Sequence, residues 1–505
     1  MKIAITGATG NLGKSVLKEL LQLDFVETIN ILGHNKKRTE DLIKKNKKYK
    51  KKIHVVMGSL DDIESCRSLI KDMDIVINSA GVIPPLSDSK PNIAVKTNEI
   101  GVKTLVSAIE EENKTKLIHI STIDVYGYRN EKHPSGRIED PLIPSVYDVY
   151  GITKMRGEYA VLESNINSYV VLRQTAMLYD DILMKNISSE IMFQTAFNSP
   201  LEWITDKETG TLFKNIIIKE HNMELNYDNF WNKCFNVGGC RENKNTYYES
   251  IDIGFKIIGG SVPDFFNTNY DSLRNSHGIW LTDSDKLEDL FHYKSITYSE
   301  FWDKVKRKYW YFSIAKILPR KWIKKRFIDK LLDKKHSPSN WVRVNDDARI
   351  TAFFGSKENY DNIDKDWNNF NLLCKSEGYE NSKNNPNLIN YYYDVDKDIK
   401  DITIDDLRNV ATAHGGKLIS SEYNNPYQKL EWETQDKEIF MAKPYTILKC
   451  GHWYNTSYKE YAWDFDRLSK KDKIYASVWL DSHDKSENNY YYFDDNFNAM
   501  IKTNN

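Results

Sequence analysis

The sequence of 505 residues has few cysteines, little net charge and no long hydrophobic run. Its five cysteines are an odd number without paired spacing, which indicates reduced thiols in a cytoplasmic protein rather than a disulfide framework. The formal net charge of −1 creates no global field that would attract nucleic acid, so no nucleic-acid partner is expected. No apolar run approaches the ~18–20 residues of a membrane span. The first residues already form a strand and a glycine loop, so we expect no signal peptide.

Short apolar runs alternate with helical segments over the first 121 residues. Five runs are rich in Ile and Val: KIAITG, TINILG, IHVVMG, DIVINSAG and LIHIST. Each ends at a small or polar residue and is followed by helical periodicity, and a sixth run begins at Tyr169. Repeated strand–helix units predict a parallel sheet with right-handed crossovers. The predicted fold class is therefore α/β, a doubly wound Rossmann sheet.

A glycine-rich loop, TGATGNLG, joins the first strand to the first helix. Gly7 permits a tight turn, Gly10 lets the backbone approach a pyrophosphate, and Gly13 lets the helix pack on the strand. The helix N-terminus offers free N–H groups and partial positive charge to a diphosphate. The position of the loop, between a clear strand and a clear helix, predicts a dinucleotide site.

The second strand ends without the acidic residue that would bind the ribose hydroxyls of NAD. His34, Lys36, Lys37 and Arg38 follow instead. Lysine and arginine side chains form ion pairs with the 2′-phosphate of NADP, whereas a carboxylate repels that phosphate. We therefore predict NADP as the cofactor, with NAD as the alternative.

Tyr150 and Lys154 are spaced so that both side chains lie on one face of a helix. An ordinary tyrosine has a pKa of about 10, and a nearby cation favours its phenolate. Such a phenol can exchange a proton with a substrate oxygen while hydride moves to or from nicotinamide. Thr122, at the end of the fifth strand, can bond the same oxygen. These three residues are the predicted catalytic group.

The chain resembles the extended short-chain dehydrogenase/reductase family, which includes nucleotide-sugar epimerases, dehydratases and steroid-dehydrogenase-like reductases. The shared motifs are TGATGNLG, INSAG, TNEIGVKTL, STIDVYG and YGITK, in the family's order over roughly residues 1–310. The resemblance implies a small-molecule substrate, and the family often forms homodimers. It also implies a cofactor site that comprises Gly7, Thr9, Gly10, Asn11, Leu12, Gly13, His34, Lys36, Ser59, Leu60, Ala80, Gly81, Asn98, Ser121, Tyr150 and Lys154.

Departures from the family motifs bear on the reaction. Dehydratases carry an acid directly after the catalytic threonine, where this chain has Ile123 followed by Asp124. Sugar epimerases carry an asparagine where this chain has Ala176, and the adenine-contact aspartate is Ser59. We therefore expect hydride transfer at a hydroxyl or ketone carbon. A nucleotide-sugar epimerase and a non-catalytic nucleotide-sensing protein are the alternatives.

Several residues near this group have two interpretations. Tyr147 either lies in a loop or lines the substrate cleft, and Ser145 lies near it in sequence. Tyr126 is expected in the core. His119 and His133 have no arranged partner and are not expected to be catalytic.

Composition changes divide the chain into four predicted parts. Residues 1–175 form the nucleotide-binding domain, with returning segments from 176–300, and residues 176–300 form a smaller substrate subdomain. Residues 301–340 form a basic, aromatic helical linker, divided by Pro319. Its aromatics either pack on the core or mark a peripheral membrane contact within 301–336, and packing on the core is favoured. Residues 341–505 form a separate α+β module.

The segment 410–460 resembles a short zinc-ribbon-type repeat, read from HGGKLISSEY through YTILKCGHWYNTSY. The four ligand places hold Leu418, Thr434, Tyr454 and Ser457, which bind zinc poorly, and Glu438 stands where a histidine is usual. We therefore expect a metal-free copy, and no metal site elsewhere. Covering the substrate cleft and mediating assembly are the two roles open to this module.

Overall fold

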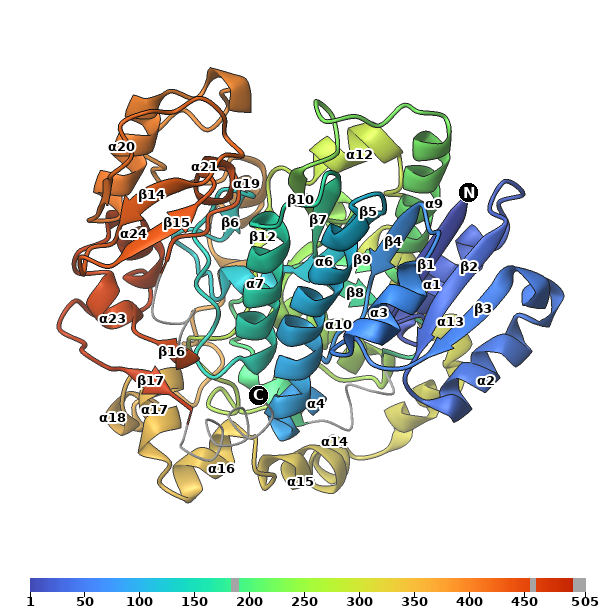
Figure 1. The fold of residues 1–505 in the computed structure, drawn as a ribbon. Helices are drawn as coiled ribbons and strands as arrows, with labels where there is room; N and C mark the ends of the chain where they lie inside the picture. Colours follow the sequence, from blue (N-terminus) through green and yellow to red (C-terminus); the bar gives the residue numbers. More distant parts are fainter. Residues whose placement is uncertain (183–189, 455–459, 494–505) are drawn as a thin grey trace.

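A seven-stranded parallel sheet forms the centre of the N-terminal half (Figure 1). The computed structural model describes residues 1–182, 190–454 and 460–493. The strand order is β10-β7-β5-β4-β1-β2-β3, and every neighbouring pair is parallel. The strands are β1 (Lys2–Thr6), β2 (Thr28–Gly33), β3 (Ile53–Met57), β4 (Ile75–Asn78), β5 (Lys116–Thr122), β7 (Tyr169–Gln174) and β10 (Lys233–Val237).

The chain winds from β1 outward in two directions, so the order reverses between β1 and β4. One face of the sheet carries α1 (Asn11–Leu20) and α9 (Asp206–His221), which contact each other. The other face carries α3 (Ile63–Ile70), α6 (Gly101–Glu112) and α7 (Val149–Leu162). Because both faces are covered, the central strands β1, β4, β5 and β7 are buried over most of their length. The predicted doubly wound Rossmann fold is confirmed.

Smaller sheets extend from the carboxyl edge of the main sheet. β8 (Ala176–Leu178), β9 (Pro200–Thr205) and β11 (Lys244–Thr246) form one, and β6 (Ser135–Gly136) pairs with β12 (Trp280–Leu281). α9 and β10 return from this region to the main sheet.

The basic segment forms α13 (Tyr298–Lys308), the 3-10 turn Trp310–Ile317, and a helix composed of α14 (Arg320–Ile323), a π-helical stretch Lys324–Ile328 and α15 (Asp329–Leu332). Leu331 is buried, but Trp310, Trp322 and Phe327 are exposed. The favoured expectation that the aromatics of this segment pack on the core is wrong for these three residues. Among the described residues, no helix has the length and apolar character to cross a bilayer.

The C-terminal region packs around α7 and shares its core (Figure 1, orange to red). Its elements include α16 (Pro338–Arg343), α17 (Asp347–Phe354), α20 (Ile404–Ala413), β13 (Lys417–Leu418), β14 (Leu430–Glu433), β15 (Ile439–Ala442), α21 (Pro444–Leu448) and β17 (Tyr491–Tyr492). Trp432 and Trp453 belong to the same buried cluster as Ile152 and Met155 of α7. The predicted α+β content is therefore present, on a core continuous with that of the nucleotide fold.

Candidate active site

The glycine loop adopts a conformation that only glycine allows. Gly7 has φ +69°, and a Cβ there would lie 2.7 Å from the amide nitrogen of Ala80. A Cβ on Gly13 would lie 2.3 Å from the carbonyl oxygen of Gly7, so α1 could not approach the loop. The Gly10 amide donates to the Gly7 carbonyl at 2.9 Å. No side chain caps α1, whose first N–H groups are thus available to an anion.

The other predicted cofactor residues follow the carboxyl ends of neighbouring strands. Because β1 to β4 are parallel, these ends share one edge of the sheet, where the strand order reverses. His34 and Lys36 follow β2 and are exposed, and Ala80 and Gly81 follow β4. The hydroxyl of Thr6 accepts from the Ala80 amide at 3.0 Å. This bond ties the loop after β4 to the glycine turn.

Two predicted cofactor residues have other contacts. Asn98 is buried, and its Oδ1 accepts from the Val82 amide at 2.8 Å. Its amide nitrogen donates to the Val82 carbonyl at 3.0 Å and to the Thr153 hydroxyl at 3.1 Å. Asn98 therefore holds the loop after β4 against α7. Leu60 is buried beside Gly101 of α6.

The predicted catalytic residues meet at the start of α7. Asp148 caps this helix by accepting from the Gly151 amide at 2.9 Å, which places Tyr150 in the first turn. The Thr122 side chain lies near enough to the Tyr150 hydroxyl to act on the pKa of that phenol, and the Thr122 hydroxyl accepts from the Asp124 amide at 3.2 Å. Lys154, one turn further, is buried and donates to the Ile120 carbonyl at 2.5 Å. The structure thus brings Thr122 and Tyr150 close together, with Lys154 directed at the backbone of β5.

The electrostatics around Tyr150 differ from the expectation. Burial and the nearby carboxylates of Asp124 and Asp148 raise the pKa of Tyr150, and the Thr122 side chain opposes this only in part. Burial also lowers the pKa of Lys154 to about 8. The expected lowering of the Tyr150 pKa by a neighbouring ammonium is therefore wrong, because Lys154 bonds the Ile120 carbonyl instead. Tyr150 is a protonated phenol at neutral pH.

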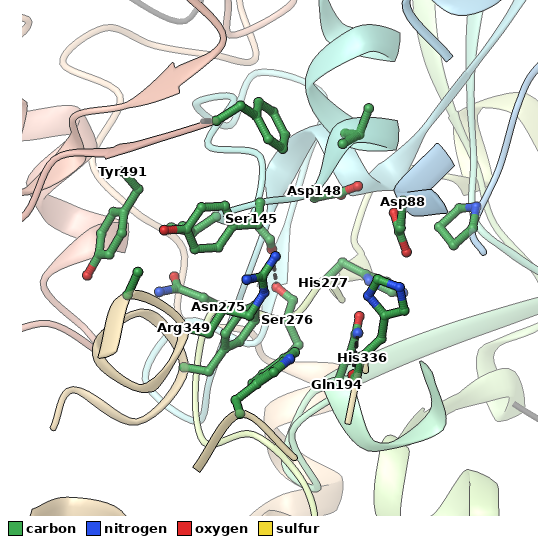
Figure 2. A pocket seen from close by; sticks show the side chains of 18 of the residues that line it. Asp88, Ser145, Asp148, Gln194, Asn275, Ser276, His277, His336, Arg349 and Tyr491 are labelled. Atoms are coloured by element: carbon green, nitrogen blue, oxygen red, sulfur yellow. Dashed lines mark hydrogen bonds between the residues drawn. The ribbon is translucent and has the colours of Figure 1, made fainter. Parts of the chain in front are cut away.

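A cavity of about 870 Å³ opens beside the start of α7 (Figure 2). The nucleotide fold contributes Asp88, Asp124 and Asp148 to its wall. Burial raises the pKa of Asp88, and burial together with Asp124 raises that of Asp148 well above its ordinary value. One Asp148 carboxylate oxygen is buried without a hydrogen-bond partner. This side of the cavity is suited to hydrogen bonding with a polar ligand.

Basic groups also line the cavity. His277 comes from the substrate region, and Lys335, His336 and Arg349 come from the chain after residue 334. Figure 2 shows His277 and His336 side by side. Arg349 lies 5.3 Å from the ring centre of Tyr147. A ligand in this cavity would thus meet both acidic and basic groups, and Asp88 lies close to His277 and His336.

Some of the residues that lie near Tyr150 in the sequence also line this cavity. Tyr147 does, as does Ser145, which donates to the Ser276 carbonyl. Tyr126 is buried and bonds Asn236 and Arg173, as expected for a core residue. Sequence reasoning missed Arg349 and His336, because they stand about two hundred residues from Tyr150 and carry no motif.

The positions expected from the zinc-ribbon resemblance are separated by secondary structure. β13, β14 and β15 form a three-stranded antiparallel sheet. Leu418 lies in β13, and Thr434 lies in the turn between β14 and β15. Ser457 lies outside the described residues. The one cluster with ligand-like spacing in the described ranges is Asp466, His483 and Glu487.

That cluster is already paired within the protein. Glu487 holds Arg274 through two contacts of 2.7 Å, and Asp466 accepts from the Trp479 indole at 2.7 Å. A cation would have to displace Arg274.

The sequence similarity between this chain and the known proteins compared with it lies in about the first third of the chain. Residues 3–177 match the model of the NAD dependent epimerase/dehydratase family. An uncharacterized membrane protein of Methanocaldococcus jannaschii is 30% identical over 175 residues, 34% of this chain and 46% of that protein. A 3 beta-hydroxysteroid dehydrogenase/Delta 5→4-isomerase of monkeypox virus is 24% identical over 180 residues, 35% of this chain and 49% of that protein. The matched part thus spans about half the length of these curated relatives.

A solved structure is also similar to this chain. It is that of the dTDP-glucose 4,6-dehydratase of Bacillus anthracis in complex with NAD, with a TM-score of 0.48 and 18% identity. The likeness covers 62% of this chain and 98% of that one.

Proposed function

We propose that this chain is an NAD(P)-dependent oxidoreductase that transfers hydride at a hydroxyl or ketone carbon. The observation that carries the proposal is the proximity of the Thr122 side chain to the Tyr150 hydroxyl, at the sheet edge that also carries the glycine loop. The pair stands next to a cavity lined by Asp124 and Asp148. A substrate that extends from this cavity to Tyr150 would bring its oxygen to the phenol, on the side of the sheet edge that carries the glycine loop.

The cofactor residues fit a dinucleotide. Gly7 and Gly13 allow the close loop that cradles a diphosphate, and the uncapped start of α1 supplies its donors. Ala80 and Gly81 would border the ribose, and Ser59 the adenine. The exposed His34 and Lys36 would take a 2′-phosphate, which favours NADP over NAD. When bound, the nicotinamide accepts or supplies the hydride.

Tyr150 is the proposed acid/base. As a phenol it donates its proton to a carbonyl oxygen during reduction, while Thr122 bonds the same oxygen and orients it. In the oxidation direction the phenolate must form, and the carboxylates of Asp124 and Asp148 oppose this. Lys154 acts by fixing the end of β5 through the Ile120 carbonyl and by supplying positive charge beneath the site.

An epimerase is the second candidate, supported by the family model that matches residues 3–177. The two reactions differ in net redox change. We would incubate the protein with NADP⁺ or NAD⁺, testing sugar nucleotides and secondary alcohols separately. Net formation of reduced nucleotide supports the oxidoreductase. Conversion of a sugar nucleotide to its epimer without net reduction supports the epimerase. Nucleotide binding without turnover of any substrate supports the sensing protein.

A further inference from the structure

Residues 306–330 present large apolar side chains to solvent, and we call this surface the basic aromatic face. Trp310 is 68% exposed, Ile317 81%, Trp322 50% and Phe327 52%. Tyr311, Ile314 and Leu318 are exposed in the same segment. Contiguous apolar exposure of this kind is rare on a surface without a partner. Figure 1 shows α14 and α15 at the lower edge of the molecule.

The same residues carry strong positive charge. Ten lysines and arginines stand against one acid, Asp329, within residues 306–330, in a chain whose net charge is −1. Lys321, Lys325 and Arg326 are exposed beside Trp322 and Phe327, whose rings lie 6.2 Å apart. Aromatic rings with lysine and arginine around them are typical of surfaces that enter the interfacial layer of a bilayer.

The orientation of this segment is fixed by its other side. Ile323, Ile328 and Leu331 are buried in a cluster with Phe265 and Phe266 of the substrate region. Arg320 pairs with Asp264 at 2.8 Å. The helix over Arg320–Leu332 is therefore anchored through one stripe, and Trp322 and Phe327 stay outside the core because their stripe faces away from it.

A basic groove adjoins the exposed rings. It has a volume of about 370 Å³, and Lys306, Arg307 and Lys316 line it next to Trp310. Asp303 also lines it, but none of these three cations forms an ion pair with a carboxylate in the described part of the chain. Cations without an ion-pair partner, next to apolar side chains, are suited to bind the phosphate of a lipid headgroup while the acyl chains of that lipid stay in the bilayer.

We infer that the basic aromatic face docks this protein on an anionic lipid bilayer, as a peripheral contact. Nucleic acid would engage the lysines but leave Ile314, Ile317 and Leu318 in water, whereas a bilayer satisfies both the charge and the apolar area. α15 ends at Leu332, three residues before Lys335, which lines the large cavity. Docking would hold that cavity close to the membrane surface.

Flotation of the full chain with vesicles tests this inference. One vesicle would be phosphatidylcholine alone, and the other would contain about 30 mol% phosphatidylserine. We expect at least about tenfold stronger binding to the anionic vesicle, weakened by salt. Equal binding to both vesicles, or none to either, would overturn the inference.

Two combined variants separate the contributions. The apolar variant is Trp310→Ser, Ile317→Ser, Trp322→Ser and Phe327→Ser, and the charge variant is Lys321→Glu, Lys325→Glu and Arg326→Glu. Each should lower anionic-vesicle binding about tenfold or more. A control with Met223→Ser and Ile439→Ser, both exposed elsewhere, should bind like the unchanged protein.

Other partners of this face would give different results. Self-association that the apolar variant abolishes, without vesicle binding, would assign the face to a second copy. RNA binding that the charge variant alone abolishes, without vesicle binding, would assign it to nucleic acid. Either result contradicts the inference. Nucleotide binding, measured in parallel, should be equal in all variants. A loss of vesicle binding can therefore be distinguished from a failure of the proposed enzyme function.

Discussion

The start of α7 brings the carboxylates of Asp124 and Asp148 close to the Tyr150 phenol, whereas the Lys154 ammonium is directed at the backbone of β5. Asp124 and Asp148 both raise the pKa of Tyr150, and burial adds to their effect. The nearest ammonium, Lys154, bonds the Ile120 carbonyl. In the proposed reaction Tyr150 would donate its proton, and the oxidation direction would depend on the positive charge of an oxidised nicotinamide.

Asp124→Asn tests this balance at one residue. Removing the negative charge lowers the pKa of Tyr150, so phenolate forms at lower pH. We expect the rise of the oxidation rate with pH to move to lower pH, as measured by a pH–rate profile with a substrate that the incubations proposed above turn over. Asp41→Asn, on the exposed side of α2 (Lys36–Lys45), is the control and should not shift the profile. An unmoved profile in Asp124→Asn would show that Asp124 does not act on the reacting phenol.

Lys36→Glu tests the cofactor assignment. A carboxylate there repels a 2′-phosphate, so NADPH affinity should fall about tenfold or more while NADH affinity stays within about twofold. Titration of both nucleotides measures this. Lys44→Glu, in the last turn of α2, leaves both affinities unchanged if the effect is local. Tighter NADH than NADPH binding by the unchanged protein would refute the NADP preference.

Individual residues were predictable where the backbone demands them. A side chain on Gly7 would collide with Ala80, and one on Gly13 would collide with Gly7. The glycines of the motif therefore predict the conformation of the loop. The direction of Lys154 could not be predicted, because its spacing from Tyr150 is compatible with either the phenol or a backbone carbonyl as its partner. Asn98 was likewise recognised as part of a motif, although its contacts are to Val82 and Thr153.

At the scale of elements, α7 joins the site to the C-terminal region. Glu158 of α7 and Arg173 of β7 pair at 2.6 Å in full burial. His452 reaches the same carboxylate at 3.0 Å, and Arg173 donates to the Cys450 carbonyl at 2.6 Å. One buried network therefore holds α7, the sheet and the segment after α21 together.

His452 makes this junction sensitive to acid. Burial lowers the pKa of His452 below its ordinary 6.5, although Glu158 opposes the shift. The unfolded chain therefore binds more protons than the native one below pH 6.5, so stability falls as pH decreases through that window and is fully present above it. The limiting slope for one histidine is about 1.4 kcal/mol per pH unit.

His452→Gln should reduce that slope, as measured by denaturant unfolding at a series of pH values. His54→Gln, on exposed β3, is the matched control and should keep the slope of the unchanged protein. The same slope in His452→Gln and in the unchanged protein would show that His452 does not titrate between the two states.

The strands of the nucleotide fold were predictable because buried parallel strands are continuous apolar runs. All five predicted runs and the run at Tyr169 became strands of the main sheet. The seventh strand, β10, was not predicted, because Lys233–Val237 is short and contains Lys, Cys and Asn. Its identity as a strand comes from pairing with β7.

At the scale of the whole molecule, the C-terminal region completes the core and one wall of the cavity. Trp432 and Trp453 share a cluster with Ile152 and Met155, and Arg349 faces the cavity. Composition marks a boundary near residue 340, but it cannot show which surfaces pack together. Those contacts join residues about three hundred positions apart.

The shared core predicts one cooperative unfolding transition. Trp432→Ala removes a fully buried indole and should lower the free energy of unfolding by about 3–5 kcal/mol. Near-ultraviolet circular dichroism and nucleotide release should report the same midpoint in denaturant. Ile439→Ala, exposed on the neighbouring strand β15, should change stability by less than about 0.5 kcal/mol. Two separate transitions would show that the C-terminal region folds independently.

The central claim, acid/base chemistry by Tyr150, is tested most directly by nucleotide reduction. The protein and its Tyr150→Phe variant would be given oxidised nucleotide and a small-molecule extract, and reduced nicotinamide would be followed by its fluorescence. Tyr159→Phe, on the same helix, is the control. We predict reduction by the unchanged protein and by the control, and a loss of about a hundredfold or more in Tyr150→Phe with nucleotide affinity retained. Equal reduction by Tyr150→Phe and the unchanged protein would contradict the account.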